Sequence, residues 1–164
     1  MRISSILLLT LALLVSGCMT NPIPEGYSGP RATVQDWARS ETNSRASVFS
    51  LAEVDGKRIR TSVEATRASV YGKGVQIYFS PQTISREVPA TSVVLKLEGR
   101  IMYSAPIQEL LMAATLYQVD SIIEVTLEQG ERYVVKGDLF EDKREIYLEK
   151  VSTGQRVGSA VSKK

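Results

Sequence analysis

Apolar and polar residues alternate along most of the chain after residue 45, in short runs separated by Gly, Pro, Ser and Asp. A two-residue period places successive side chains on opposite faces of a strand, so each run predicts a strand with one buried face. The expected strands cover 46–54, 57–63, 67–71, 75–80, 93–98, 101–103, 123–127, 132–140, 144–151 and 155–161. Short strands with frequent turn signals predict a mainly β fold, an antiparallel β-sandwich with one short helix. A small closed barrel is the alternative, because it produces the same alternation.

One segment, from 105 to about 117, has the three- and four-residue spacing of a helix. Ser104 is suited to cap its first turn, and Pro106 is tolerated there. The residues with this spacing are Ile107, Leu110, Leu111 and Ala114.

The first eighteen residues have the layout of an export signal. Arg2 supplies a positive start, residues 6–15 are apolar, and the small pair Ser16-Gly17 precedes Cys18. The sequence therefore predicts a signal peptide over 1–17 that is removed. Two alternatives are a plain secretory signal with an incidental cysteine and an uncleaved membrane anchor, for which the apolar run is short.

The end of this segment, Leu14-Val15-Ser16-Gly17-Cys18, resembles the lipobox of bacterial lipoproteins. The resemblance implies a diacylglyceryl group on the Cys18 sulfur, cleavage before Cys18, and acylation of the new amino group. The chain would then bind the membrane through the lipid on Cys18. In similar enteric lipoproteins, aspartate after the cysteine causes inner-membrane retention. Met19 at that position implies an outer-membrane location, with the domain facing the periplasm.

Residues 18–45 are expected to form the lipidated N-terminus and a tether, and 46–164 the β-sandwich domain. Prolines and glycines interrupt the tether and disfavour regular pairing. Trp37 is expected to pack this arm against the domain. The motif Gly26-Tyr27-Ser28-Gly29-Pro30, followed by Asp36, resembles uncharacterised proteobacterial envelope lipoproteins. That resemblance implies an envelope lipoprotein and supplies no catalytic residues.

Composition narrows the chemistry that the chain can perform. The 164 residues carry a net charge of +2 and contain no histidine and one cysteine. The near-neutral charge gives no reason to expect nucleic acid binding, and no Lys/Arg run predicts adhesion to anionic lipid. Without histidine or a free thiol, Ser-His-Asp triads, thiol catalysis and Cys/His zinc sites are excluded. We expect no cofactor, no metal and no enzyme activity.

Three groups of residues invite functional interpretations. Gly72-Lys73-Gly74 lacks phosphate-loop spacing and is better explained as a strand bend. An acidic set is interleaved with basic residues and favours a solvated hairpin with charge pairs over a calcium site. The outward phase of Tyr78 and Tyr147 makes these two tyrosines a candidate ligand surface. The acidic set contains Glu141, Asp142, Glu145 and Glu149.

Together these patterns predict a lipid-anchored, non-catalytic binding or scaffolding module with a protein partner in the envelope. The alternative is a carbohydrate- or peptide-binding module that uses the tyrosines. A hydrolase that relies on carboxylates alone is a third possibility, although no two acids are placed as such a mechanism requires.

Overall fold

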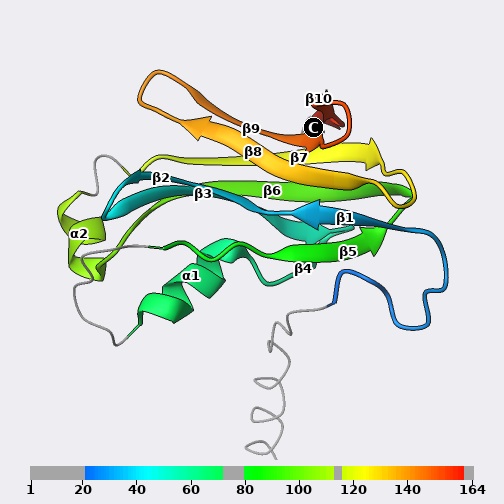
Figure 1. Cartoon of the computed structure of the whole chain (residues 1–164), viewed down its shortest axis with the longest axis horizontal. Helices are drawn as coiled ribbons and strands as arrows, with labels where there is room; N and C mark the ends of the chain where they lie inside the picture. The colour runs from blue at the N-terminus through cyan, green and yellow to red at the C-terminus, as the bar shows by residue number, and fades with distance from the viewer. Residues whose placement is uncertain (1–20, 72–79, 113–115, 161–164) are drawn as a thin grey trace, which may run out of the picture.

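The computed structural model describes residues 21–71, 80–112 and 116–160, which form two facing β-sheets and two short helices (Figure 1). One sheet has the strand order β10-β9-β8-β1-β5, and the other has the order β11-β7-β6-β3-β2, with β4 paired to β3. The strands and helices of the first half are β1 (Arg31–Gln35), β2 (Trp37–Thr42), β3 (Arg45–Val54), β4 (Lys57–Arg58), α1 (Ser62–Val70) and β5 (Ser85–Pro89). Those of the second half are β6 (Ser92–Tyr103), α2 (Pro106–Leu111), β7 (Gln118–Thr126), β8 (Arg132–Leu139), β9 (Arg144–Lys150), β10 (Gln155–Val157) and β11 (Ser159–Ala160).

The predicted β-sandwich is confirmed, and the described strands form two layers rather than a closed barrel. Most neighbouring strands are antiparallel, and β1 with β8 is a parallel pair. Alternate residues of both sheets point inward and form one hydrophobic core. Removing this apolar surface from water is the main favourable contribution to folding.

The middle of the core is occupied by the ring of Phe49 in β3, which is fully buried. Trp37 stacks on it with ring centroids 5.6 Å apart. Gly99 of one sheet and Gly137 of the other border the same ring: a Cβ added to Gly99 would lie 3.0 Å from Phe49 Cδ1, and one at Gly137 would lie 2.5 Å from Phe49 Cε1. The predicted turn at Gly99-Arg100 is wrong, because β6 runs straight through it and Gly99 provides space for the ring.

The strands predicted over 57–63 and 67–71 are also wrong. Only Lys57–Arg58 pairs with β3, and Ser62–Val70 is helix α1. A capping box begins this helix: Thr61 Oγ1 accepts from the Glu64 backbone N–H, and the Glu64 carboxylate accepts from the Thr61 backbone N–H. Val63 packs on the outer face of β3 and β6, in a small second cluster. The strand predicted over 75–80 lies outside the described residues.

The boundary predicted at residue 46 comes too late in the chain. Residues within the predicted tether form β1 and β2, and β1 is a central strand of its sheet, between β5 and β8. Ala32 and Val34 are the buried residues of β1, and they face the core. Trp37 packs on the core as expected, but it does so as part of β2 in the sheet.

Helix α2 is shorter than the predicted 105–117, and the described residues of its apolar stripe are exposed. Ile107 is 54% exposed, Leu110 72% and Leu111 76%. Ala105 occupies the N-cap position without a side-chain hydrogen bond, whereas Ser104 Oγ donates to Gln108 Oε1. No helix within the described residues is long and apolar enough to cross a membrane.

Candidate functional site: a groove at one end of the sandwich

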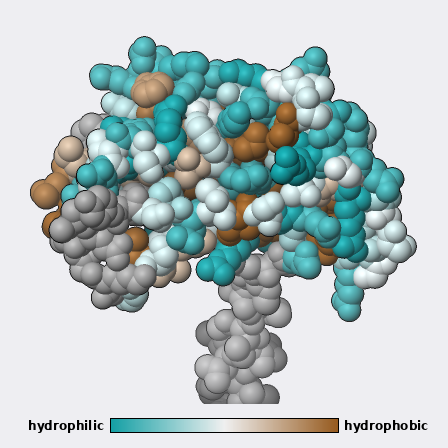
Figure 2. All heavy atoms as spheres, viewed as in Figure 1, coloured by the Kyte–Doolittle hydropathy of each residue, from teal (hydrophilic) through white to brown (hydrophobic). Residues whose placement is uncertain are grey.

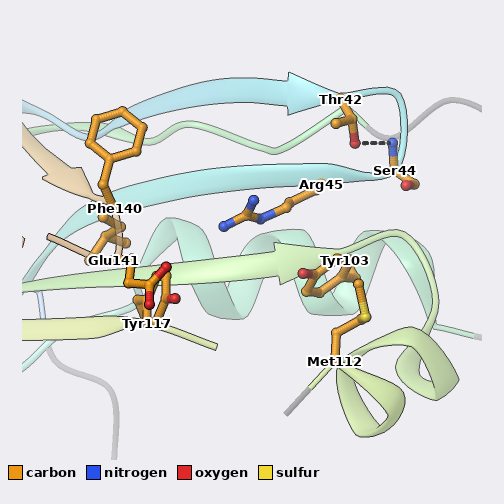
Figure 3. Close-up of a pocket in the computed structure, with 9 residues that line it drawn as sticks. Thr42, Ser44, Arg45, Tyr103, Met112, Tyr117, Phe140 and Glu141 are labelled. Atoms are coloured by element: carbon orange, nitrogen blue, oxygen red, sulfur yellow. Dashed lines mark hydrogen bonds between the residues drawn. The ribbon is translucent and has the colours of Figure 1, made fainter. Parts of the chain in front are cut away.

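A groove of about 480 Å³ opens at the end of the sandwich where α2 lies, and we call it the end groove (Figure 3). Three chain segments meet there: the turn between β2 and β3, the stretch from the end of β6 to the start of β7, and the turn between β8 and β9. Its lining residues are Thr42, Ser44, Arg45, Tyr103, Met112, Tyr117, Leu139, Phe140 and Glu141.

Aromatic side chains form much of the wall, and arginines cover two of them from outside the groove lining. The Arg144 guanidinium carbon lies 4.4 Å from the centre of the Tyr117 ring, and that of Arg39 lies 4.8 Å from the centre of the Phe140 ring. Such cation–π contacts hold a ring in place. The backbone N–H of Phe140 also donates to the Lys143 carbonyl and closes the turn that carries this residue.

Arg45 is the cationic residue of the lining, and its guanidinium lies at the middle of the residues drawn in Figure 3. Its Nη1 lies 3.2 Å from Glu41 Oε2. Its Nε is buried and has no hydrogen-bond partner in the described structure. Buried polar groups are nearly always hydrogen-bonded, so this N–H is an exception beside the groove.

The groove combines apolar and aromatic walls with one unused donor and one carboxylate, that of Glu141, at its edge. No ion pair is formed by Glu141 within the described chain. A few polar groups on an otherwise apolar wall are typical of sites that bind a small ligand. The residues fit a ligand with an apolar or planar face and a polar edge.

Two of the three residues predicted for sites lie outside the described residues, namely Cys18 and Tyr78, and so does the Gly72-Lys73-Gly74 bend. The third, Tyr147, is half-buried in β9, and the Arg156 guanidinium carbon lies 3.6 Å from its ring centre. One face of the Tyr147 ring is therefore covered, and this tyrosine does not line the end groove.

Two members of the acidic set, Glu145 and Glu149 in β9, form charge pairs of the kind that the sequence predicts. Glu145 lies 2.7 Å from Arg156 and 3.1 Å from Lys143, and Glu149 lies 2.6 Å from Lys136. Hydrogen bonds from Arg156 and Lys143 lower the pKa of Glu145. Among the described residues, no group of three or more acidic, His or Cys side chains is arranged to hold a metal ion.

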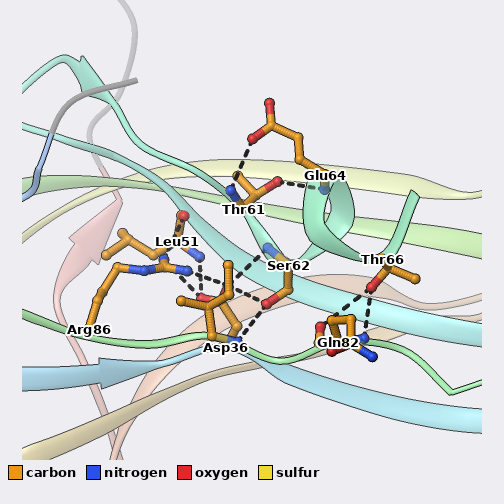
Figure 4. A network of polar contacts seen from close by, with 9 residues as sticks. Asp36, Leu51, Thr61, Ser62, Glu64, Thr66, Gln82 and Arg86 are labelled. Carbon is orange, nitrogen blue, oxygen red and sulfur yellow. Dashed lines mark hydrogen bonds and ion pairs between the residues drawn. The ribbon is translucent and has the colours of Figure 1, made fainter. Parts of the chain in front are cut away.

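Sequence reasoning missed a buried polar network around Asp36 (Figure 4). The fully buried Asp36 carboxylate accepts hydrogen bonds from the Leu51 backbone N–H at 2.9 Å, from Ser62 Oγ at 2.7 Å and from both Arg86 Nη atoms, the shorter at 2.7 Å. Burial raises the pKa of Asp36, and the Arg86 charge opposes this effect. The network joins β3, α1 and β5 inside the protein, so its role is structural.

The residues of the end groove were missed because they come from distant parts of the chain. Thr42 and Glu141 are almost a hundred positions apart, and only the strand order of the two sheets brings them together. Comparison with known proteins adds no relative: no family model, no curated protein and no solved structure matches this chain.

Proposed function

We propose that this protein is a lipid-anchored envelope lipoprotein, on the periplasmic side of the outer membrane, that acts as a non-catalytic binding or scaffolding module. The end groove is its ligand-binding site. The observation that carries the binding role is the groove itself, about 480 Å³ with aromatic walls and the unused Nε–H of Arg45. The lipobox resemblance, with Cys18 as the sole cysteine, carries the anchoring role.

The chemistry of the chain supports binding rather than catalysis. The absence of histidine leaves carboxylates as the main candidates for acid–base work. Several carboxylates are already engaged within the protein. Glu145 and Glu149 are held in ion pairs, and Asp36 is buried and paired with Arg86. Glu141 is the single carboxylate of the groove lining, whereas glycoside hydrolysis ordinarily uses two.

The ligand that suits the groove best is a segment of an envelope protein that inserts an apolar side chain between Phe140 and Met112 and offers a carbonyl to Arg45. The second candidate is a carbohydrate, favoured by the Tyr117 and Phe140 rings in the wall. Sugars commonly bind proteins by placing their C–H faces on such rings, which are apolar at the face and polar at the edge. In either case the ligand is held without bond chemistry.

Crosslinking in intact cells tests this proposal. A photo-reactive amino acid replaces Glu141 at the groove edge, and a matched control replaces the exposed Gln155 on the far edge strand β10. We expect position 141 to crosslink a discrete envelope protein and position 155 not to. In the protein with the photo-reactive residue at position 141, the further substitution Phe140→Ala should abolish the crosslinked product, while the amount of folded protein stays constant.

If no protein is captured, saturable binding of cell-wall oligosaccharides to the purified chain, abolished by Phe140→Ala, would favour the carbohydrate alternative. Equal crosslinking at both positions, or products that are insensitive to Phe140→Ala, would refute the end groove as the binding site.

A further inference from the structure

We infer that the side of the molecule formed by β4, α1 and α2 is a docking face for an anionic lipid bilayer, in which basic residues contact head groups and apolar residues enter the interface. This inference rests on the proposed lipid anchor and adds how the domain lies on the membrane. The docking face consists of the exposed residues Lys57, Arg60, Arg67, Tyr71, Ile107, Leu110 and Leu111.

The basic part of the docking face was not apparent as a run in the sequence. Lys57 in β4, Arg60 in the following loop and Arg67 in α1 are exposed, and none of the three forms an ion pair within the described chain. Nearby, Glu64 is engaged by Arg58 and by the capping box of α1. Glu109 lines a cavity together with Arg67, but among the described residues no ion pair joins it to any of the three cations, and an anionic lipid surface attracts such exposed cations.

The apolar part of the face lies directly after the last turn of α1 and on α2. Tyr71, directly after α1, is 88% exposed, and Leu110 and Leu111 of α2 are the next most exposed large hydrophobic residues. A cavity of about 220 Å³ is lined by both Tyr71 and Glu109, which places the end of α1 beside α2. Apolar residues gather at the α2 end of the molecule in Figure 2. Clustered exposed apolar side chains mark a contact surface, and tyrosine favours the membrane–water interface.

The position of the chain start indicates what covers this face. The described chain begins at Asn21, three residues after Cys18, and three residues span at most about 11 Å. The segment before β1 runs to the side of the sheets where α1 and β4 lie (Figure 1). A lipid on Cys18 would therefore hold this side toward the bilayer, and tethering makes even weak contacts effective.

A bilayer explains this combination better than a protein partner does. Basic side chains, an interfacial tyrosine and exposed leucines occur on one side, and it is the side toward which the described segment before β1 runs (Figure 1). This is the composition of surfaces that lie in the head-group region, with charge for the phosphates and apolar residues for the acyl boundary.

The test uses the purified full chain, anchored in phosphatidylcholine vesicles with or without phosphatidylglycerol. Acylation of the Cys18 sulfur would leave an introduced cysteine as the one reactive thiol, so Leu110→Cys can carry an environment-sensitive fluorophore. Gln155→Cys, on the opposite edge of the sandwich, carries the same label as a control. The charge variants are Arg60→Glu and Arg67→Glu, matched by Arg132→Glu on β8.

We expect the label at 110, and not at 155, to report an apolar environment when phosphatidylglycerol is present, and high salt to reverse this. Arg60→Glu and Arg67→Glu should each lower the docked fraction about fivefold, and Arg132→Glu should leave it unchanged. A label at 110 that stays in water on anionic vesicles, or equal effects of all three reversals, would overturn the docking face.

A separate measurement shows whether the proposed lipid anchor is present. Mass spectrometry of the same preparation reports whether Cys18 is acylated. If it is not, the proposed lipoprotein function fails, and the docking face is then read from cosedimentation of the Cys18→Ser chain with anionic vesicles, with Arg67→Glu against Arg132→Glu as the deciding comparison.

Discussion

Two glycines border the buried ring of Phe49, and they differ in what an added Cβ would meet. A Cβ at Gly137 would lie 2.2 Å from the Glu145 backbone oxygen, whereas one at Gly99 would meet only side-chain atoms, the nearest at 2.9 Å. We predict that Gly137→Ala lowers the free energy of unfolding by about 1–3 kcal/mol, and that Gly99→Ala costs less because side chains can move aside. Urea denaturation followed by Trp37 fluorescence measures both, and equal losses would contradict the packing of this ring.

Two arginine–carboxylate pairs with the same N–O distance allow a test of how burial changes the contribution of an ion pair to stability. Asp36–Arg86 and Arg31–Glu87 both have an N–O distance of 2.7 Å, but the first is inside the protein and the second is about half exposed. Asp36→Asn should lower the free energy of unfolding by about 3 kcal/mol, because it leaves the buried Arg86 charge unpaired. Glu87→Gln should cost less than about 1 kcal/mol. Similar losses for the two variants, measured by thermal denaturation, would argue against a buried charge at Arg86.

Asp138 contributes to the loss of folding stability at low pH. Hydrogen bonds from Lys143 and Arg39 lower the pKa of Asp138 in the folded state. A lowered pKa contributes stability above the unfolded-state pKa, and this contribution is lost as the pH falls through the folded-state pKa. Asp138→Asn should therefore lose less stability than the wild type between about pH 4 and pH 2. Asp142→Asn in the same turn is the control and should follow the wild type in denaturation at each pH.

At the scale of elements, strands with clean alternation could be predicted, and those that depend on distant neighbours could not. The expected strand over 46–54 is β3, and that over 144–151 is β9. In contrast, α1 contains β-branched Val63, Thr66 and Val70, which favour a strand by local preference. Its Thr61-x-x-Glu64 capping signal is present in the sequence, but the outer face of β3 and β6, on which Val63 packs, is known only from the fold.

The capping box gives a direct test of this helix. Thr61→Ala removes the side-chain acceptor for the Glu64 backbone N–H and should lower the free energy of unfolding by about 1 kcal/mol. Thr61→Ser keeps the oxygen and should remain close to the wild type. Chemical denaturation compares the two variants, and a loss shared equally by both would mean that the hydroxyl group does not cap α1.

At the scale of the whole molecule, a few adjacent residues are enough to predict where in the cell the protein is located. No set of adjacent residues predicts the candidate site. The lipobox is contiguous, whereas the end groove requires Arg45, Tyr117 and Phe140 to meet across two sheets. The sequence also predicted which residues share a face of α2, but helical periodicity does not show whether another element covers that face.

Lipidation remains a prediction, and it is tested on the intact protein. The N-terminal peptide of the mature chain should begin at an acylated Cys18, as seen by mass spectrometry, and the protein should fractionate with the outer membrane. Cys18→Ser should abolish acylation. A purified chain that still carries residues 1–17 and a free thiol would contradict the prediction.

The place of β1 in its sheet has a consequence for the order of folding. Thr33 of this first strand pairs with Glu87 on one side and with Arg132 on the other. Pairings between residues so far apart in sequence form late and slowly. During synthesis or translocation from the N-terminus, β1 has no parallel neighbour until β8 has emerged, so the sheet closes only when most of the chain is available. Closure of this sheet should therefore be among the last steps of folding.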